Sequence, residues 1–148
     1  MARMLPTDPA AAITPESLMV RVYYEDTDAA GVVYYANYWR FCERGRTEWL
    51  RRQGFDQQQL MDETGIAFVV RRVEGDYHRP ARLDDTLQIL TSVSTLKRAS
   101  LSFSQKIFRD AELLFEAAVS VACLDTKRNR AVAIPDIIRK TLNPGQPG

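Results

Sequence analysis

The segment from Tyr24 to Tyr38 holds the residues best suited to chemistry. It reads YEDTDAAGVVYYANY, and the carboxylates Glu25, Asp26 and Asp28 fall within four residues, just before a stretch with helical spacing. A helix N-terminus offers unpaired backbone N–H groups and a partial positive charge. A carboxylate aimed at the same point would join a base or nucleophile to an oxyanion donor, the two groups that acyl transfer needs.

Two other interpretations of this segment need weighing. Asp and Thr residues before a helix most often cap it, but Asp28 lies several residues before the regular helical pattern. The series Asp26-x-Asp28-x-x-Gly31 also matches the start of a calcium-binding EF-hand loop. Its fifth and twelfth positions, however, are Ala30 and Asn37 instead of ligands of the expected kind.

The remaining reactive residues form no recognisable constellation. The single histidine, His78, stands at a predicted strand end before Arg79-Pro80, where we expect a structural role. Cys42 and Cys123 lack metal-ligand spacing and a neighbouring histidine; they form either a single bridge or, as we expect, two small hydrophobes in a reducing cytosol. No serine lies in a G-x-S-x-G motif. Elimination therefore favours carboxylate chemistry without a metal or cofactor.

The elements that must position these carboxylates follow from periodicity. Residues Leu18–Glu25 are rich in β-branched and aromatic side chains and predict a strand. Ala36–Arg52 predicts a long helix, and Phe55–Gly65 is partly helical. One face of the long helix comprises Tyr34, Tyr38, Phe41, Cys42, Gly45 and Trp49. A glycine in mid-helix is costly, so Gly45 predicts the close approach of another backbone.

Four later segments alternate with period two and predict strands: Ile66–His78, Thr86–Leu96, Leu101–Arg109 and Leu113–Leu124. Short connections join the last three into an antiparallel meander. Leu113–Leu124 reads as apolar on both faces, which predicts a helix over one face and a second subunit over the other. With a short helix after Pro135, the fold class is α+β, a curled antiparallel sheet wrapped round one long helix.

Composition limits the classes of protein further. The chain has 148 residues, 45% of them hydrophobic, and a net charge of +1. This composition excludes a wholly disordered chain and gives no global field toward nucleic acid, so no nucleic acid partner is expected. No apolar run is long enough for a membrane span, and the proline-interrupted N-terminus is not a signal peptide. We expect a cytoplasmic protein with one domain over residues 18–142, a flexible leader over 1–17 and a tail over 143–148.

Several motifs together resemble a known family. They are Asp-Thr-Asp-x-x-Gly-Val-Val-Tyr at 26–34, Asn37-Tyr38, Arg46-Thr-Glu, Ala67-Phe-Val-Val-Arg71, Tyr77 and Pro80-Ala-Arg-Leu-Asp-Asp85. Over residues 18–140 the chain resembles the hot-dog-fold acyl-CoA thioesterases of the 4-hydroxybenzoyl-CoA thioesterase type, most closely the branch associated with the bacterial Tol–Pal system. That branch usually has histidine where this chain has Tyr35, and tyrosine there resembles the 4-hydroxybenzoyl-CoA branch.

The resemblance implies a hot-dog protomer that pairs into a dimer with a continuous sheet, often within tetramers, with active sites at the subunit interface. It implies that Asp28 is the catalytic carboxylate and that the backbone N–H near Tyr35 polarises the thioester carbonyl. It also implies two groups of substrate-binding residues, Gly31, Val32, Val33 and Tyr34 at the reacting end, and Lys97 and Arg98 at the CoA phosphates.

The function expected from the residues and the resemblance together is hydrolysis of an acyl-CoA thioester, or of an acyl carrier protein thioester. The alternative is a non-catalytic module that binds acyl-CoA or acyl carrier protein at the inner membrane face. A third class, the hot-dog dehydratases, would need a histidine near the central helix, and His78 lies in another segment.

Overall fold

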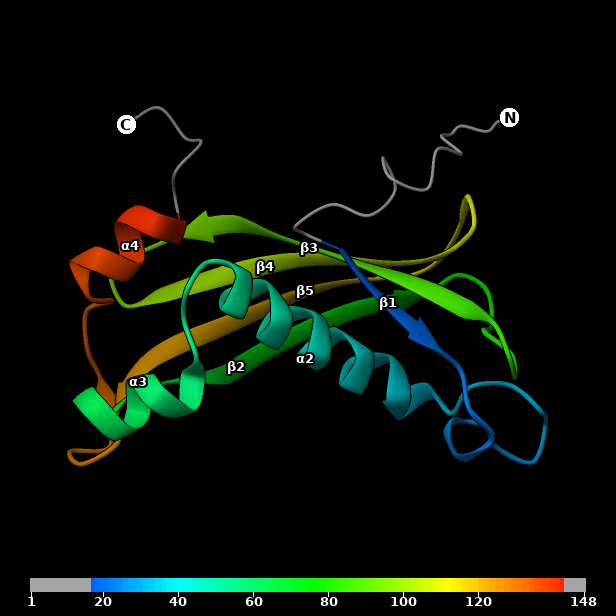
Figure 1. Cartoon of the computed structure of the whole chain (residues 1–148), viewed down its shortest axis with the longest axis horizontal. Helices are drawn as coiled ribbons and strands as arrows, with labels where there is room; N and C mark the ends of the chain where they lie inside the picture. The colour runs from blue at the N-terminus through cyan, green and yellow to red at the C-terminus, as the bar shows by residue number, and fades with distance from the viewer. Residues whose placement is uncertain (1–16, 143–148) are drawn as a thin grey trace.

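The computed structural model describes residues 17–142, in which one long helix lies in the hollow of a curved antiparallel sheet (Figure 1). In chain order the elements are β1 (Ser17–Arg21), the 3-10 turn η2 (Tyr24–Asp26), α2 (Tyr35–Arg52), α3 (Gln57–Thr64), β2 (Ile66–Tyr77), β3 (Thr86–Leu96), β4 (Ser100–Arg109), β5 (Glu112–Asp125), β6 (Arg130–Ala131) and α4 (Asp136–Leu142). The tail and almost all of the predicted leader lie outside the described residues. Ser17, placed in the leader, already belongs to β1.

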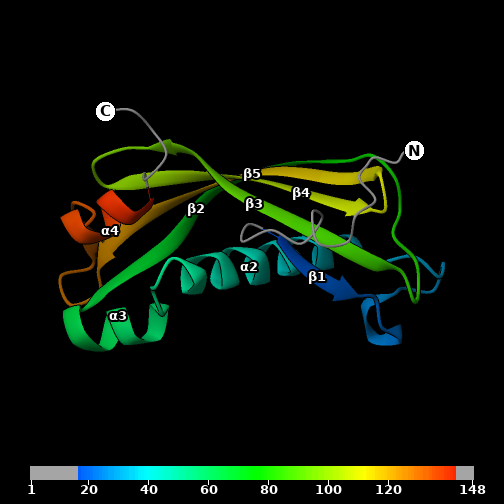
Figure 2. The same ribbon diagram turned by 45° about the horizontal axis from the view of Figure 1, so that its top comes forward.

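The sheet order is β1-β3-β4-β5-β2, with the short β6 beside β5. The predicted meander is confirmed, because β3 pairs with β4 and β4 with β5 in antiparallel register. The strand that precedes this meander pairs with its last member, since β2 lies against β5 instead of β3. Figure 2 shows the sheet curling over α2. Strand β2 is therefore left at an edge of the sheet.

The predicted helix and its buried face are confirmed with one exception. Five of the six residues expected on that face are buried, together with Asn37 and Leu50. The exception is Tyr34, which caps α2 in an extended conformation and is exposed, because the helix begins only at the next residue. The indole ring of Trp49 packs edge-on against the ring of Phe103 at 5.6 Å between centroids, which ties the C-terminal half of α2 to β4.

Gly45 does mark a close approach, but to side chains and not to another backbone. A Cβ atom at Gly45 would lie 2.8 Å from Ile89 Cγ2 and 3.0 Å from Thr91 Oγ1, both on β3. The same opening lets Gln105 of β4, only 1% exposed, donate from Nε2 to the Cys42 carbonyl oxygen and to Thr91 Oγ1, each at 2.9 Å. The helix thus lies directly on a buried polar group whose hydrogen bonds are satisfied.

The expectation of two apolar faces on β5 is only half correct. The face toward α2 is buried and includes Phe115, Val119 and Val121. The other face carries Glu116, Ala118, Ser120 and Ala122, none of which is buried. Leu114 is buried because the register shifts beside it, between Ile107 and Phe108, and not because a second apolar face continues along the strand.

The first strand is shorter than predicted. The chain leaves β1 after Arg21 and turns at η2, instead of staying extended to Glu25. Asp26 Oδ2 accepts a hydrogen bond from the Tyr23 N–H at 2.8 Å, so a side chain replaces the strand partner that the Tyr23 N–H would otherwise need. This turn is what directs the following acidic residues toward the start of α2.

Cys42 and Cys123 are free and fully buried, as expected of small hydrophobes. Burial raises the pKa of the Cys42 thiol to about 12. Among residues 17–142, no three His, Cys, Asp or Glu side chains are grouped so that they could hold a metal ion. None of the helices in this part of the chain has the length and apolar character needed to cross a membrane.

The contact at Gly45 gives a stability prediction. Gly45→Ala raises helix propensity by about 1 kcal/mol, but its methyl group would press on Ile89 and Thr91. Overpacking of this kind costs about 1–3 kcal/mol. We therefore expect a net loss in the free energy of unfolding, measured by urea titration. The exposed Arg44→Ala serves as the control and should change it by no more than about 0.5 kcal/mol. A stabilised Gly45→Ala variant would contradict this packing.

Candidate active site

The acidic residues and the start of α2 lie on the two arms of one tight loop. The Asp28 N–H donates to the Val32 carbonyl at 2.9 Å, and the Tyr34 N–H donates to the Asp26 carbonyl at 2.9 Å. Thr27 and Val33 form an antiparallel bridge between these two bonds. The arm that carries the carboxylates is thereby hydrogen-bonded to the arm that leads into the helix.

The two aspartates have different surroundings. Asp26 is engaged in the turn through its side chain, and its carbonyl also accepts a bond from Asn37 Nδ2 at 2.9 Å. Asp28 is exposed, and its Oδ1 accepts a single hydrogen bond, from the Ala30 N–H at 2.9 Å. Neither aspartate caps α2, because Tyr34 occupies the N-cap position without a side-chain hydrogen bond. Asp28 is the carboxylate left available to a ligand.

The first turn of α2 has a backbone N–H group without an acceptor in the part of the chain that the structure describes. It contains no acidic residue, and no acceptor among residues 17–142 is bonded to the Tyr35 N–H. The Asn37 N–H is already bonded to the Tyr34 carbonyl at 2.8 Å. An unpaired N–H at a helix start is suited to an oxygen that carries developing negative charge.

The other predicted residues of the loop divide by exposure. Gly31 has a φ of +80°, a conformation that favours glycine, and it closes the turn by donating to the Asp28 carbonyl at 3.0 Å. Val32 is half-buried, whereas the side chain of Val33 is buried in the core. Tyr34 is exposed; the neighbouring Tyr35 phenol, and to a lesser degree the Asp28 carboxylate, raise the pKa of Tyr34.

A second loop, Pro80–Asp85, supports the first from below. The Val33 N–H donates to the Ala81 carbonyl at 2.8 Å, and the Ala81 N–H donates to the Tyr38 hydroxyl oxygen at 2.9 Å. Arg109 holds the far end of this loop by donating to Asp85 Oδ2 at 2.7 Å. Burial raises the pKa of Tyr38, so its hydroxyl stays protonated at neutral pH.

An aromatic wall extends from the helix start to the edge of the sheet. The indole Nε1–H of Trp39 donates to the Tyr77 hydroxyl at 2.9 Å, and this hydroxyl lies 3.4 Å from the Tyr35 carbonyl oxygen. Trp39 fits over Gly75, where a Cβ atom would come within 2.7 Å of its ring. The end of β2 that carries Tyr77 is therefore attached to the start of α2.

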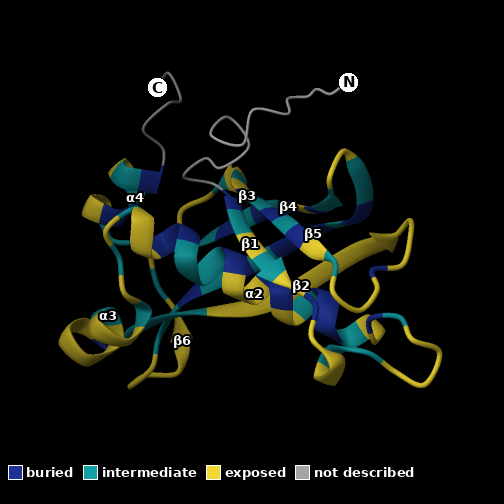
Figure 3. Ribbon diagram, turned by 45° about the vertical axis from the view of Figure 1, so that its right-hand side comes forward, coloured by how far each residue is buried: buried dark blue, intermediate teal, exposed yellow. Residues whose placement is uncertain are grey.

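Strand β2 carries an apolar inner face that α2 does not cover. Val70 and Val73 pair with the buried Val121 and Val119 of β5, so they point to the same side of the sheet as the helix. They are nevertheless 51% and 48% exposed. Figure 3 shows exposure along much of β2. This uncovered face and the unpaired edge adjoin the aromatic wall at Tyr77.

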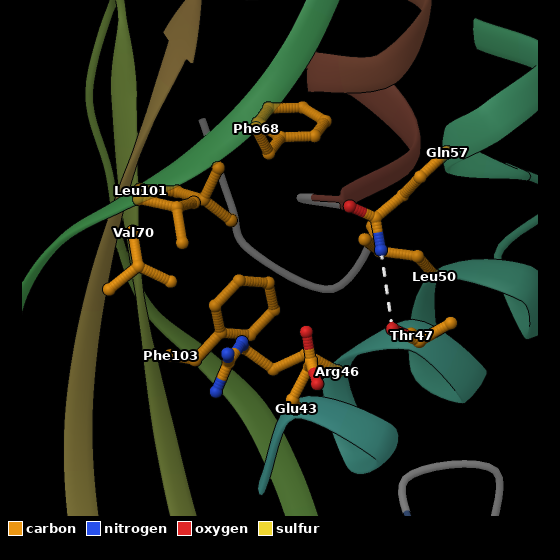
Figure 4. Close-up of a pocket in the computed structure, with 10 residues that line it drawn as sticks. Glu43, Arg46, Thr47, Leu50, Gln57, Phe68, Val70, Leu101 and Phe103 are labelled. Carbon is orange, nitrogen blue, oxygen red and sulfur yellow. Dashed lines mark hydrogen bonds between the residues drawn. The ribbon is translucent and has the colours of Figure 1, made fainter. Parts of the chain in front are cut away.

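A cavity of about 90 Å³ opens farther along α2, about 16 Å from Tyr35 by the helical rise (Figure 4). Polar side chains of the two helices, Glu43, Arg46, Thr47 and Gln57, form one side of it. Apolar side chains, among them Phe68 and Val70 of β2 and Phe103 of β4, form the other. The cavity thus lies at the Ile66 end of β2, while the Asp28 loop lies at the Tyr77 end.

The structure separates the predicted phosphate-binding residues from Asp28 within one protomer. Lys97 and Arg98 lie in the hairpin between β3 and β4, beside α4, whose Arg139 donates from Nη1 to the Lys97 carbonyl oxygen. Strand β3 spans roughly 35 Å between this hairpin and the end of β1. The Asp28 loop lies at the opposite end of the sheet (Figure 1).

From the sequence, no role in the site was assigned to Ala81 or Tyr38, which support the Asp28 loop. Tyr77 and Pro80–Asp85 were part of the resemblance, but the bonds from Ala81 to Val33 and Tyr38 join segments distant along the chain. His78 lies outside the site, with Nε2 2.9 Å from Glu116 Oε2, in line with the structural role expected of it. The cavity has no local sequence signal, because two helices and three strands contribute its walls.

Comparison with known proteins gives a consistent family. Residues 22–142 match the thioesterase-like superfamily. The acyl-CoA thioesterase YbgC of Haemophilus influenzae is 48% identical over 127 residues, which cover 86% of this chain and 93% of the relative. The acyl-CoA thioester hydrolase YbgC of Escherichia coli is 51% identical over 120 residues, covering 80% and 89%.

Solved structures agree with the fold. The probable thioesterase from Bartonella henselae has a TM-score of 0.77 and 37% identity, and the match covers 80% of this chain and 98% of that one. The predicted hot-dog fold is therefore confirmed, while the link to the Tol–Pal system stays a prediction. With this fold, this loop and these relatives, the chain belongs to the thioesterase-like superfamily.

Proposed function

We propose that this protein hydrolyses acyl-CoA thioesters to a free acid and CoA, with Asp28 as the catalytic carboxylate and the Tyr35 N–H as oxyanion donor. One observation carries the proposal: the exposed Asp28 carboxylate and the unpaired N–H at the start of α2 lie on the two arms of the same hydrogen-bonded loop. The names of the relatives, acyl-CoA thioesterase and acyl-CoA thioester hydrolase, point to the same reaction.

Asp28 can act in two ways. As a nucleophile, its oxygen bonds to the thioester carbonyl carbon, the C–S bond breaks, CoA leaves as the thiolate, and water then cleaves the mixed anhydride. As a general base, it takes a proton from the water that attacks the carbonyl. In both routes the carbonyl oxygen gains negative charge beside the Tyr35 N–H. A thiolate leaves readily, because an ordinary thiol has a pKa of about 8.5, so no strong general acid is required.

The first test replaces the carboxylate. Asp28→Asn keeps the size of the side chain and can still accept from the Ala30 N–H, but it removes the nucleophile and base. We expect kcat for acyl-CoA hydrolysis to fall at least about 10²–10⁴-fold, with acyl-CoA affinity retained. Released CoA, measured with a thiol reagent, gives the rate.

Asp26→Asn is the matched control. Because Asp26 Oδ2 serves the turn at Tyr23, this substitution should reduce mainly the free energy of unfolding. A folded but inactive Asp26→Asn beside a fully active Asp28→Asn would refute the assignment. If the wild type hydrolysed no member of a panel of short, long and aromatic acyl-CoA thioesters, a binding module for acyl-CoA or acyl carrier protein would replace the enzyme.

The site is completed by a second copy of the chain in this proposal. The uncovered inner face of β2, with Val70 and Val73, and the long unpaired edge of that strand call for a partner. Antiparallel pairing of β2 with its own copy would continue the sheet and place the second α2 over the exposed valines. The dimer is therefore argued from β2 and not, as in the sequence analysis, from β5, because the outer face of β5 is less apolar than expected.

A charge on this face tests the dimer. Val73→Asp should yield a monomer, because burying an unpaired carboxylate at such an interface is strongly unfavourable. Glu74→Gln is the control on the opposite face of the same strand and should leave the oligomer intact. Sedimentation velocity at micromolar concentration distinguishes the two. A folded, fully active wild-type monomer would refute the proposal.

Antiparallel pairing has a consequence for the acyl group. It sets the Ile66 end of one β2 against the Tyr77 end of the other. The cavity beside Phe68 and Val70 of one protomer then faces the α2 start of its partner, since Tyr77 is attached to that start. We assign this cavity to the far end of the acyl group held by the partner's loop.

In this proposal the CoA end of the substrate is bound by Lys97 and Arg98 of another subunit. These two residues lie too far from Asp28 in their own protomer. Reversal of direction across β2 brings a partner's hairpin to the same end as the Asp28 loop. Both side chains are exposed, and charge-assisted contacts to phosphates are short and strong. An acyl carrier protein thioester would present its phosphopantetheine in the same way, and association with the inner membrane face stays a prediction.

The combined variant Lys97→Ala with Arg98→Ala should raise KM for acyl-CoA, with a smaller rise for an acyl-pantetheine that lacks the nucleotide. Lys106→Ala, which removes an exposed charge from β4, is the control and should leave both KM values unchanged. Steady-state kinetics on the two substrates gives the comparison. An equal change for both substrates would exclude phosphate recognition.

A further inference from the structure

We infer that Arg46 selects short acyl groups that carry a hydrogen-bond acceptor oxygen at their far end. The inference rests on the proposed function, because it takes the cavity beside α2 to be the acyl site. It adds the chemical class of the acyl group, which the residues of the Asp28 loop do not specify.

The guanidinium of Arg46 has more donors than partners. Its Nη1 donates to Gln105 Oε1 at 2.9 Å, and no second acceptor among residues 17–142 is bonded to it. Arginine has five N–H donors in a fixed plane and keeps its charge. Its surroundings are nevertheless dry enough that burial lowers its pKa, against the opposing effects of Cys42 and Glu43. A part-buried cation with free donors at a cavity calls for an acceptor.

Gln105 fixes the position of the Arg46 guanidinium. Gln105 is buried and uses both its amide hydrogens on the Cys42 carbonyl and Thr91 Oγ1, so its Oε1 is oriented toward Arg46. This network exists because Gly45 lets α2 lie close to β3 and β4. The guanidinium therefore presents its remaining donors from a prearranged position, which lowers the entropy lost on binding.

The size and walls of the cavity define the rest of the ligand. Its volume of about 90 Å³ is smaller than the roughly 150 Å³ of an apolar cavity that accepts benzene. Phe68, Val70 and Phe103 suit a short carbon chain, and Arg46 reaches across from α2 to line the same cavity beside Phe103 (Figure 4). A group of about four non-hydrogen atoms that ends in a keto, hydroxyl or carboxylate oxygen satisfies both sides.

Glu43 makes the cavity favour a neutral acceptor over an anionic one. Its carboxylate also lines the cavity and attracts the Arg46 guanidinium electrostatically. An ionised carboxylate can only accept hydrogen bonds and repels a second anion. We therefore expect a neutral oxygen to be preferred to a carboxylate, and both to an apolar end.

Three CoA thioesters of equal size provide the test. Acetoacetyl-CoA, malonyl-CoA and isovaleryl-CoA each carry four non-hydrogen atoms beyond the thioester carbonyl, ending in a ketone, a carboxylate and a branched alkyl group. Dissociation constants are measured by calorimetry on Asp28→Asn, so that the ligands stay intact. Acetoacetyl-CoA should bind about ten- to hundredfold more tightly than isovaleryl-CoA, the range of a hydrogen bond to a charged group.

Three further variants on the Asp28→Asn background make the test specific. Arg46→Met keeps the length of the side chain without its charge and should bring the acetoacetyl-to-isovaleryl ratio close to one. Arg46→Lys keeps the charge and a donor toward Gln105, so it should retain part of the preference for acetoacetyl-CoA. It replaces Arg46→Met in the test if the Met variant fails to fold. Glu43→Gln should improve malonyl-CoA relative to acetoacetyl-CoA. A structural defect would weaken all three ligands alike and leave their ratios unchanged.

The outcomes separate this inference from the proposed function. Equal affinities for the three ligands, or a ratio unchanged in Arg46→Met and Arg46→Lys, would overturn the inference while hydrolysis by the wild type could still stand. The expected ratios in a protein whose wild type hydrolyses none of the three thioesters would support Arg46 as the selecting residue and overturn the catalytic role of Asp28.

Discussion

The close contact between α2 and the sheet at Gly45 sets the position of the helix and, through it, of both ends of the molecule. Without a side chain at this position, the helix axis comes near enough for Gln105 to bond the Cys42 carbonyl while Ile89 and Thr91 fill the remaining space. The sheet must curl to keep its apolar face on so close a helix. One end of α2 is then carried to the Asp28 loop, and its middle holds Arg46 over the cavity.

The N-terminal end of α2 is held by backbone hydrogen bonds more than by side chains. The loop arms are paired with each other, and the inner arm is paired with Ala81, which is in turn bonded to Tyr38 of the helix. Arg109 and Asp85 hold this support from outside. Such a closed set of bonds leaves Asp28 and the Tyr35 N–H free while it restricts the loop that bears them, as preorganised catalysis requires.

The protomer leaves one side of its site open. Strand β2 lies at the edge of the sheet, and its inner valines and Tyr77 are exposed in the protomer. The cavity, the helix start and the cationic hairpin stand at different points along the protomer, and the proposed pairing at the β2 edge would bring them toward one another. In this arrangement dimerisation and substrate binding would share the same surface, so loss of one would remove the other.

Local sequence patterns predicted most of the helices and strands and pointed to the segment proposed to react. Alternation in Thr86–Leu96 and helical spacing around Phe41 depend on neighbours in the chain, and the spacing of Asp26, Asp28 and Gly31 is itself local. Tertiary structure alone decided that β2 pairs with β5, that Lys97 lies far from Asp28, and that Gln105 orients Arg46. These outcomes depend on contacts between segments far apart in sequence, for which no local periodicity carries information.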